Sequence, residues 1–311
     1  MPTTLYMLSM RRNVKRISRP VRRWLMWIAC PALLTACAPV VREQDPDVLL
    51  EQAWHAFRLA DYRMALARFE RVPDSPAAGE HHRIAALYGA SVVRDMRQPI
   101  PSQDDARAAE GYRRIIAEAP EHALAPWSAL ALARMTHLVP VGEEPDYERV
   151  RAAYQEVIDR YPDHMAGHEA LLYQQSTWIM TLEPEATRRA LARLQDFVNS
   201  YPASPFLSAA YQLIGQGQET LGDADGQLEA RIRELETMEI DPSSPASADL
   251  SWRYWQIATT AEFMAGRFDV ARVYYQKLID EYPLDFRKFP ARQALARMDA
   301  LEVQLRRELS P

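Results

Sequence analysis

The chain has 311 residues, of which 48% are hydrophobic, so it is long and apolar enough to bury a sizeable core. It contains only 10 glycines, and no convincing stretch alternates apolar and polar residues, which argues against a substantial β-sheet. The net charge is −5, but residues 1–37 hold seven Lys or Arg and no Asp or Glu, which leaves −12 for the remainder. Because phosphate binding requires a basic surface, nucleic acid is not an expected partner of this acidic body.

The first 36 residues have the layout of an export signal. Seven basic residues precede a short apolar stretch, residues 25–34, that is too short to span a bilayer comfortably. Directly behind this stretch stand Leu34, Thr35, Ala36 and Cys37. This order resembles the lipobox of bacterial lipoproteins, in which the signal is cleaved before the cysteine and the cysteine is acylated. The alternatives are an ordinary secretory signal with an incidental cysteine and an uncleaved anchor.

The residues behind the lipobox bear on location. Cys37 is followed by Ala38, whereas an Asp at this place favours retention at the inner membrane in enterobacterial lipoproteins. The resemblance therefore implies a protein held by N-terminal acyl chains (palmitate among them) on the periplasmic face of the outer membrane. Residues 37–46 form the lipidated cysteine and a short tether in this interpretation, because they show no apolar periodicity.

From residue 47 onwards, apolar residues recur at helical spacing and prolines interrupt them, which predicts a series of helix pairs. Asp47 is the expected N-cap of the first helix. The expected pairs are 47–60 with 62–76, 80–97 with 104–119, 124–138 with 146–161, 164–182 with 184–200, 204–221 with 223–238, and 255–265 with 270–282, followed by a closing helix over 286–309. The Pro-bearing loops 98–103 and 139–145 are either tolerated surface insertions or partner contacts.

The prolines that end the second helices are regularly spaced. Pro120, Pro162, Pro202, Pro242 and Pro283 are separated by 42, 40, 40 and 41 residues. In most units a small residue stands twelve positions before the proline and an aromatic residue or Leu stands eight before it. The clearest unit, Trp255–Pro283, combines a large residue, a small residue, a Gly-containing turn and this ending.

This order resembles the tetratricopeptide repeat (TPR). The resemblance implies an all-α fold, a right-handed superhelical solenoid of about six TPR-like helix pairs over residues 47–285, closed by a C-terminal capping helix over 286–311. The alternative is a globular helical bundle whose prolines coincide by chance. The residues expected to pack between helices are Ala65, Phe69, Ala108, Tyr112, Tyr154, Ala190, Leu194, Trp255, Ala271 and Tyr275.

The sequence offers little that could perform chemistry. His164 and His168 are four apart, a spacing that metal ligands use, but no third ligand is evident. Nucleophile-elbow, P-loop and dinucleotide-binding motifs are absent from the sequence. We therefore expect a protein that is not an enzyme and has no metal, cofactor or small-molecule substrate.

A stack of helix pairs offers a surface for a peptide, a helix or a domain of another protein. The expected contacts are first-helix side chains that packing does not require. These candidates are Arg83, Tyr88, Trp127, Tyr173, Gln174, Trp178, Tyr211 and Trp252.

A lipobox followed by long repeats with Tyr-Pro endings resembles the BamD family, the lipoproteins of the outer-membrane β-barrel assembly machinery, and the Tol-Pal coordinator family. The resemblance implies a scaffold that docks onto other envelope proteins. This chain has about six units, where the BamD family has five. The alternatives are a TPR lipoprotein of a polysaccharide-export or pilus secretin system and an accessory of an envelope sensor kinase.

Overall fold

A computed structural model of the chain describes residues 45–96, 102–139, 142–240 and 249–309. All of these residues belong to one compact unit, which spans Glu43–Pro311. The lipobox, Cys37, most of the tether and parts of both Pro-bearing loops lie outside the described residues.

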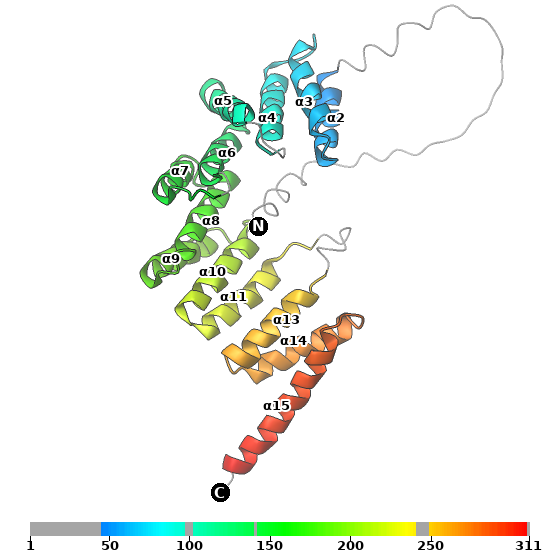
Figure 1. The fold of residues 1–311 in the computed structure, drawn as a ribbon, viewed down its shortest axis with the longest axis vertical. Helices are drawn as coiled ribbons and strands as arrows, with labels where there is room; N and C mark the ends of the chain where they lie inside the picture. Colours follow the sequence, from blue (N-terminus) through cyan, green and yellow to red (C-terminus); the bar gives the residue numbers. More distant parts are fainter. Residues whose placement is uncertain (1–44, 97–101, 140–141, 241–248, 310–311) are drawn as a thin grey trace, which may run out of the picture. The chain divides into compact units, whose positions relative to one another are not determined.

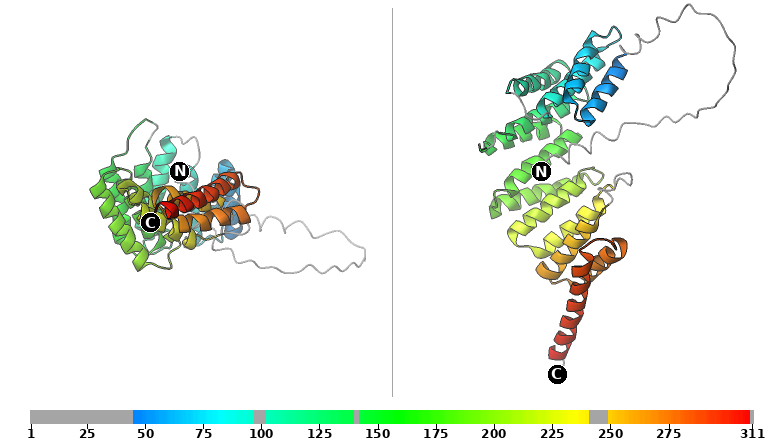
Figure 2. Two further views of the ribbon diagram at one scale, coloured as in Figure 1. Left: turned by 90° about the horizontal axis from the view of Figure 1, so that it is seen from below. Right: turned by 45° about the vertical axis from the view of Figure 1, so that its right-hand side comes forward.

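The described residues form helices and connecting turns, with no strand among them (Figure 1). The pairs are α2 (Pro46–Arg58) with α3 (Tyr62–Arg71), α4 (Glu80–Met96) with α5 (Ser102–Glu118), α6 (Ala125–His137) with α7 (Tyr147–Arg160), α8 (Met165–Ile179) with α9 (Pro184–Ser200), α10 (Leu207–Leu221) with α11 (Ala224–Thr237), and α13 (Ser251–Thr259) with α14 (Phe268–Glu281). A final helix, α15 (Lys288–Leu309), follows. Each helix contacts its neighbours in the chain, and the right-hand view of Figure 2 shows successive pairs side by side in chain order. The predicted all-α solenoid of six helix pairs with a closing helix is confirmed.

The helix ends follow from local chemistry. Asp61, Asp146 and Asp223 cap the second helices α3, α7 and α11, and each carboxylate accepts a hydrogen bond from the backbone N–H three residues later. At the other end, Tyr161 and Tyr201 are the C-caps of α7 and α9, directly before a proline that cannot continue the helix. The recurring Tyr-Pro pairs in the sequence therefore mark where second helices end.

The predicted first cap is wrong by two residues. Pro46 and Asp47 already lie within α2, and Asp45 is the N-cap, whose Oδ1 accepts a hydrogen bond from the Asp47 N–H at 3.0 Å. Proline is well suited to the first helical position because its missing N–H has no partner there in any case. The short 3₁₀ helix η3 (Val72–Asp74) ends the unit that α2 and α3 begin.

Small residues face large ones in the core, as the repeat pattern requires. The alanines and large residues expected to pack, from Ala65 to Tyr275, are at most 1% exposed, with the exception of Trp255. Trp255 is half-buried and meets the Tyr275 ring edge-on, with the ring centroids 5.6 Å apart. Such burial supplies most of the stability of a repeat stack, because no single helix pair can cover its own apolar face.

The end of α13 differs from the simple helix that the sequence predicts. A π-helical turn, η4 (Thr260–Met264), follows it, and the Arg267 N–H donates to the Ala261 carbonyl. Within this turn the buried carboxylate of Glu262 accepts a hydrogen bond from the Tyr275 hydroxyl at 2.8 Å. Single π-helical turns of this kind occur inside α-helices, frequently at functional sites.

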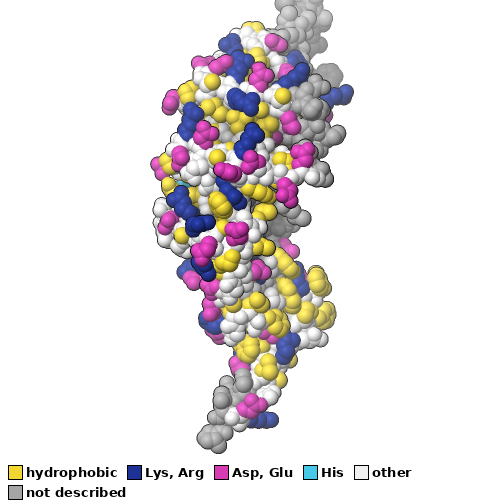
Figure 3. All heavy atoms as spheres, turned by 60° about the vertical axis from the view of Figure 1, so that its left-hand side comes forward, with side chains coloured by type: hydrophobic (Ala, Val, Ile, Leu, Met, Phe, Trp, Pro, Cys, Tyr) yellow, Lys and Arg dark blue, Asp and Glu magenta, His cyan; other side chains and the backbone are white. Residues whose placement is uncertain are grey.

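The closing helix α15 covers the stack only with its first turns. Ala291, Ala294 and Met298 are buried against the last pair, whereas Leu301 and Val303 are exposed. Among the described side chains of α15, apolar burial therefore ends at Met298, and further along the helix α14 makes contact through the ion pairs of Arg272 with Asp299 and Glu302. Figure 3 shows hydrophobic side chains gathered over the last helices on one face, while charged side chains of both signs are interspersed over the earlier ones.

Candidate protein-binding groove

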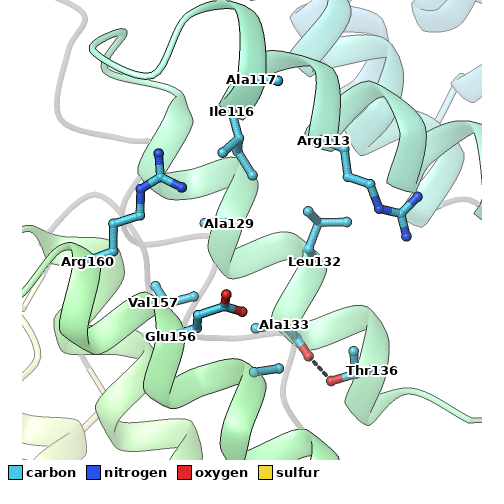
Figure 4. Close-up of a pocket in the computed structure, with 11 residues that line it drawn as sticks. Arg113, Ile116, Ala117, Ala129, Leu132, Ala133, Thr136, Glu156, Val157 and Arg160 are labelled. Atoms are coloured by element: carbon cyan, nitrogen blue, oxygen red, sulfur yellow. Dashed lines mark hydrogen bonds between the residues drawn. The ribbon is translucent and has the colours of Figure 1, made fainter.

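A groove of about 590 Å³ lies over α6 between the second helices α5 and α7 (Figure 4). Its floor residues on α6 follow a spacing of three, one and three, so they share one face of that helix. α5 and α7 contribute the two walls. The lining residues are Arg113, Ile116 and Ala117 of α5, Ala129, Leu132, Ala133 and Thr136 of α6, and Ala153, Glu156, Val157 and Arg160 of α7.

The groove is hollow because several of the residues that line it are alanine. Ala117, Ala129, Ala133 and Ala153 lie at positions where a longer side chain would fill the space between the helices. Leu132 is the largest apolar side chain of the floor and is half-buried, so part of it is available to a partner. The groove is thus an apolar hollow that the chain does not fill with its own side chains.

Charged side chains stand at the rim. Arg113 lies on the α5 wall, and Glu156 and Arg160 lie on the α7 wall (Figure 4). Arg113 and Glu156 are exposed and form no ion pair or hydrogen bond with the described residues. The hydroxyl of Thr136 on the groove floor already has a hydrogen-bond partner within α6, because it donates to the Ala133 carbonyl at 2.6 Å. An apolar centre with a charged rim is the arrangement that protein interfaces use.

A buried polar cluster lies in the same repeats. Asp95 of α4 is ion-paired with Arg134 of α6, and burial raises the pKa of the Asp95 carboxyl although Arg134 opposes this. Glu169 of α8 is 1% exposed, and neither of its oxygens has a hydrogen-bond partner among the described residues. Burial raises the pKa of Glu169 to about 7, because it outweighs the attraction of the nearby Tyr173 hydroxyl and Arg134 guanidinium.

The candidate contacts from the sequence do not line this groove. Tyr88 is only 3% exposed, so its prediction as a contact is wrong: its ring packs edge-on against Tyr112 in the core. Gln174 is also buried and donates to the Arg151 carbonyl at 3.0 Å. Both side chains are used in packing between helices, and the helical pattern of the sequence does not show this.

The other candidates are more accessible. Trp127, Tyr173, Trp178 and Tyr211 are half-buried, and Arg83 and Trp252 are exposed. Tyr173 stacks on Tyr154 with ring centroids 5.6 Å apart, so most of its contact surface is already used. Trp178 lines a second groove, between α7 and α9. The α5–α7 groove was missed because four of its eleven lining residues are alanine, a residue type that does not stand out as a contact, and the signal that could have found it is the recurrence of alanine on three successive helices.

The two histidines considered as ligands have structural roles. The Nδ1 of His164 accepts the Ala166 N–H at 3.0 Å and so caps α8, and the His168 Nδ1 lies 3.3 Å from the Ser204 hydroxyl. Burial lowers the pKa of both imidazoles. Within the described ranges, no three His, Cys, Asp or Glu side chains are grouped so that they could hold a metal ion. None of the helices described there is both long and apolar enough to cross a membrane.

One family of known proteins matches the last repeat of the stack. The tetratricopeptide repeat family matches residues 254–285, which cover most of α13 together with η4, α14 and the turn after them. A solved structure, residues 1–338 of Acl4, the assembly chaperone of RpL4, is similar with 15% identity and a TM-score of 0.41, covering 84% of this chain and 99% of that chain. A search of the curated proteins found no match.

The class that these observations define is a helical-repeat protein of the TPR type. Six helix pairs stack in order, and the last of them is a recognisable TPR. Such a stack is the architecture of a protein-interaction scaffold, since it presents side chains of many helices on continuous surfaces.

Proposed function

We propose that this protein is a lipid-anchored scaffold on the periplasmic face of the outer membrane that binds other envelope proteins, most directly in outer-membrane protein assembly. The observation that carries the binding role is the α5–α7 groove, with its alanine-rich floor and unpaired rim charges. The order Leu34-Thr35-Ala36-Cys37 behind a basic and apolar leader supports the lipid anchor and the export. The BamD-like combination of lipobox and Tyr-Pro repeats supports the choice of envelope system.

The groove suits a segment of a protein partner. Its volume of about 590 Å³ takes a few apolar side chains. A partner helix or strand could place apolar side chains against Leu132 and Val157 and meet Arg113 and Glu156 with charges of opposite sign. Arg113 and Glu156 differ in sign and stand on different walls, so they would also select the direction of the bound segment.

Site-specific photocrosslinking tests the groove. A photoreactive amino acid replaces Leu132 in the groove or, as the control, Ala106, which is exposed on α5 outside it. We expect a crosslink to one envelope protein from position 132 only, and its loss when Ala117→Trp fills the groove. Equal crosslinking from both positions, or none from position 132, would overturn the groove as the binding site.

The identity of the crosslinked partner tests which envelope system the protein serves. A component of barrel assembly with periplasmic domains supports the proposal, and depletion of the chain then lowers outer-membrane proteins broadly. A secretin, a polysaccharide porin or a sensor kinase overturns the assembly role and identifies one of the alternatives. The anchor is tested separately with Cys37→Ser, which we expect to abolish palmitate labelling and to release the chain from the outer-membrane fraction.

A further inference from the structure

A second groove lies across α7 from the first, over α8 and between α7 and α9. It has a volume of about 300 Å³. Its lining residues are Arg151 and Gln155 of α7, Gln174, Gln175 and Trp178 of α8, and Arg189 and Arg193 of α9. Three are arginine and none is acidic, which is unusual in a body whose residues beyond Cys37 carry a net charge of −12.

Arg151 is held rigidly within this groove. Its Nε donates to the Thr177 hydroxyl at 2.9 Å and an Nη to the Thr177 carbonyl at 3.0 Å. The guanidinium lies over the Trp178 ring, 3.5 Å from its centroid. Arg151 forms no ion pair among the described residues, and burial lowers the pKa of its guanidinium. It is therefore a preorganised positive charge with no carboxylate in direct contact among the described residues.

Arg189 and Arg193 supply the opposite wall. They lie one turn apart on α9, and both are exposed. Neither has a hydrogen bond or ion pair within the described part of the chain, whereas their neighbour Arg188 is paired with Glu185. Repulsion among like charges that share one hollow costs stability unless a ligand neutralises them.

Another arginine of the chain, Arg231, occupies a position equivalent to that of Arg151. Arg231 stands 80 residues after Arg151, two repeats later, and reaches the next first helix in the same way, donating to the Thr260 hydroxyl at 2.7 Å. There, however, Glu219 lies 3.7 Å from the guanidinium and neutralises it. Around Arg151 no described carboxylate forms such an ion pair, and Glu183 acts on its guanidinium only through longer-range attraction.

The glutamine side chains of the groove form hydrogen bonds within the protein, so the arginines are the main donors still available to a ligand. Gln175 donates to the Gln174 side-chain oxygen at 2.8 Å, and Gln174 donates to the Gln155 oxygen at 3.0 Å. Gln155 in turn donates to Asp159 at 2.7 Å. This chain of amides orients the floor, and the hydrogen-bonding capacity that remains comes mainly from guanidinium groups, which match carboxylates.

We infer that this groove binds an acidic peptide segment whose carboxylates stand at alternate positions. Arg189 and Arg193 are one helical turn apart, about 6 Å along α9. Alternate residues of an extended peptide point to the same side and are about 6.6 Å apart, so two carboxylates would meet the two arginines and one could also reach Arg151. This inference deepens the proposed scaffold function and rests on it for the choice of a peptide rather than a free anion.

The test uses the full-length chain in detergent and a labelled, capped hexapeptide that carries two glutamates separated by one residue. We expect saturable binding by fluorescence anisotropy that weakens with added salt, and at least a tenfold weaker binding by the double variant Arg189→Gln/Arg193→Gln. The matched control Arg188→Gln changes a paired arginine on the same helix and should stay within twofold of the parent chain.

Three results would overturn the inference. These are equal binding of a peptide with glutamine in place of both glutamates, unchanged binding by the double variant, and displacement of the peptide by inorganic phosphate at comparable concentration, which would instead assign a small-anion site. Crosslinking from position 132 does not depend on these arginines, so failure of this groove and failure of the scaffold function are separately visible.

Discussion

The carboxylate of Asp95 on α4 forms a buried ion pair with Arg134 on α6, 39 residues further along the chain. The Tyr112 hydroxyl of α5 donates to the same carboxylate at 3.4 Å. Three successive helices thus meet at one charge, which ties two repeats together. The side chains of Asp95 and Arg134 are 3% and 11% exposed, so neither charge can be hydrated if the other is removed.

We therefore expect Asp95→Ala to lower the free energy of unfolding by about 3–5 kcal/mol, because the buried Arg134 guanidinium would lose the carboxylate with which it is ion-paired. Urea denaturation followed by circular dichroism measures this. Replacing both partners by leucine should recover much of the loss, and Arg114→Gln, which removes an exposed pair with Glu118, should leave the midpoint unchanged. An Asp95→Ala midpoint equal to that of the parent chain would contradict the structural role of the pair.

Gly167 at the start of α8 allows the Tyr161 end of α7 to approach closely. A methyl group on Gly167 would overlap the Tyr161 carbonyl oxygen, a backbone atom that cannot move cheaply. Gly215 within α10 has no atom closer than 3.6 Å to the same position. We expect Gly167→Ala to destabilise the fold by about 2 kcal/mol or more and Gly215→Ala to stabilise it by up to ~1 kcal/mol through helix propensity. Thermal unfolding of the two variants side by side measures the opposite signs, and shifts in the same direction would refute the packing argument.

Glu169 makes stability depend on pH. Its folded-state pKa of about 7 lies above the ordinary value of 4.5, so the fold favours the protonated carboxyl. Below pH 4.5 both states are protonated. As pH rises from 4.5 to about 7 only the unfolded chain ionises, and stability falls by about 3 kcal/mol in total.

Glu169→Gln should remove this contribution. The variant should match the parent chain near pH 4.5 and be the more stable of the two above pH 7, as measured by urea denaturation across this range. Glu148→Gln, which changes an exposed residue of α7, is the control and should keep the parental slope. Parallel pH curves for Glu169→Gln and the parent would show that the carboxyl does not retain its proton on folding.

Arg297 fastens the closing helix to the π-helical turn. Its guanidinium donates to the Glu262 carboxylate, whose side chain is 3% exposed, while Arg297 itself is partly exposed. Arg297→Met should weaken the docking of α15 by about 1–3 kcal/mol, because one buried carboxylate loses a charged donor. Hydrogen exchange should then speed up in residues 288–298, with Arg292→Met as the exposed control on the same helix. Unchanged exchange in that segment would mean that Ala291, Ala294 and Met298 hold the helix without the ion pair.

The helix pairs were predictable because the signals that define them are local. Proline ends a helix through its own ring, an aspartate caps the helix that follows it, and a small residue four positions before a large one faces the same neighbour. These rules placed α7, α9 and α14 and identified the buried Ala271 and Tyr275. They failed at Asp47, where Pro46 moved the helix start, and at Thr260–Met264, where a buried carboxylate and its partners from α14 and α15 fix the backbone.

The sequence by itself determined the all-α repeat architecture and the lipobox pattern on which the proposed anchor depends, because both are written in short-range order along the chain. The tertiary structure decided which faces remain open. Tyr88 is buried and Trp178 borders a basic groove because neighbouring repeats cover one and not the other. The Asp95–Arg134 pair and the arginines of α7 and α9 come together from positions about 40 residues apart. Burial and charge neutralisation depend on such distant neighbours, so no local pattern in the sequence could specify them.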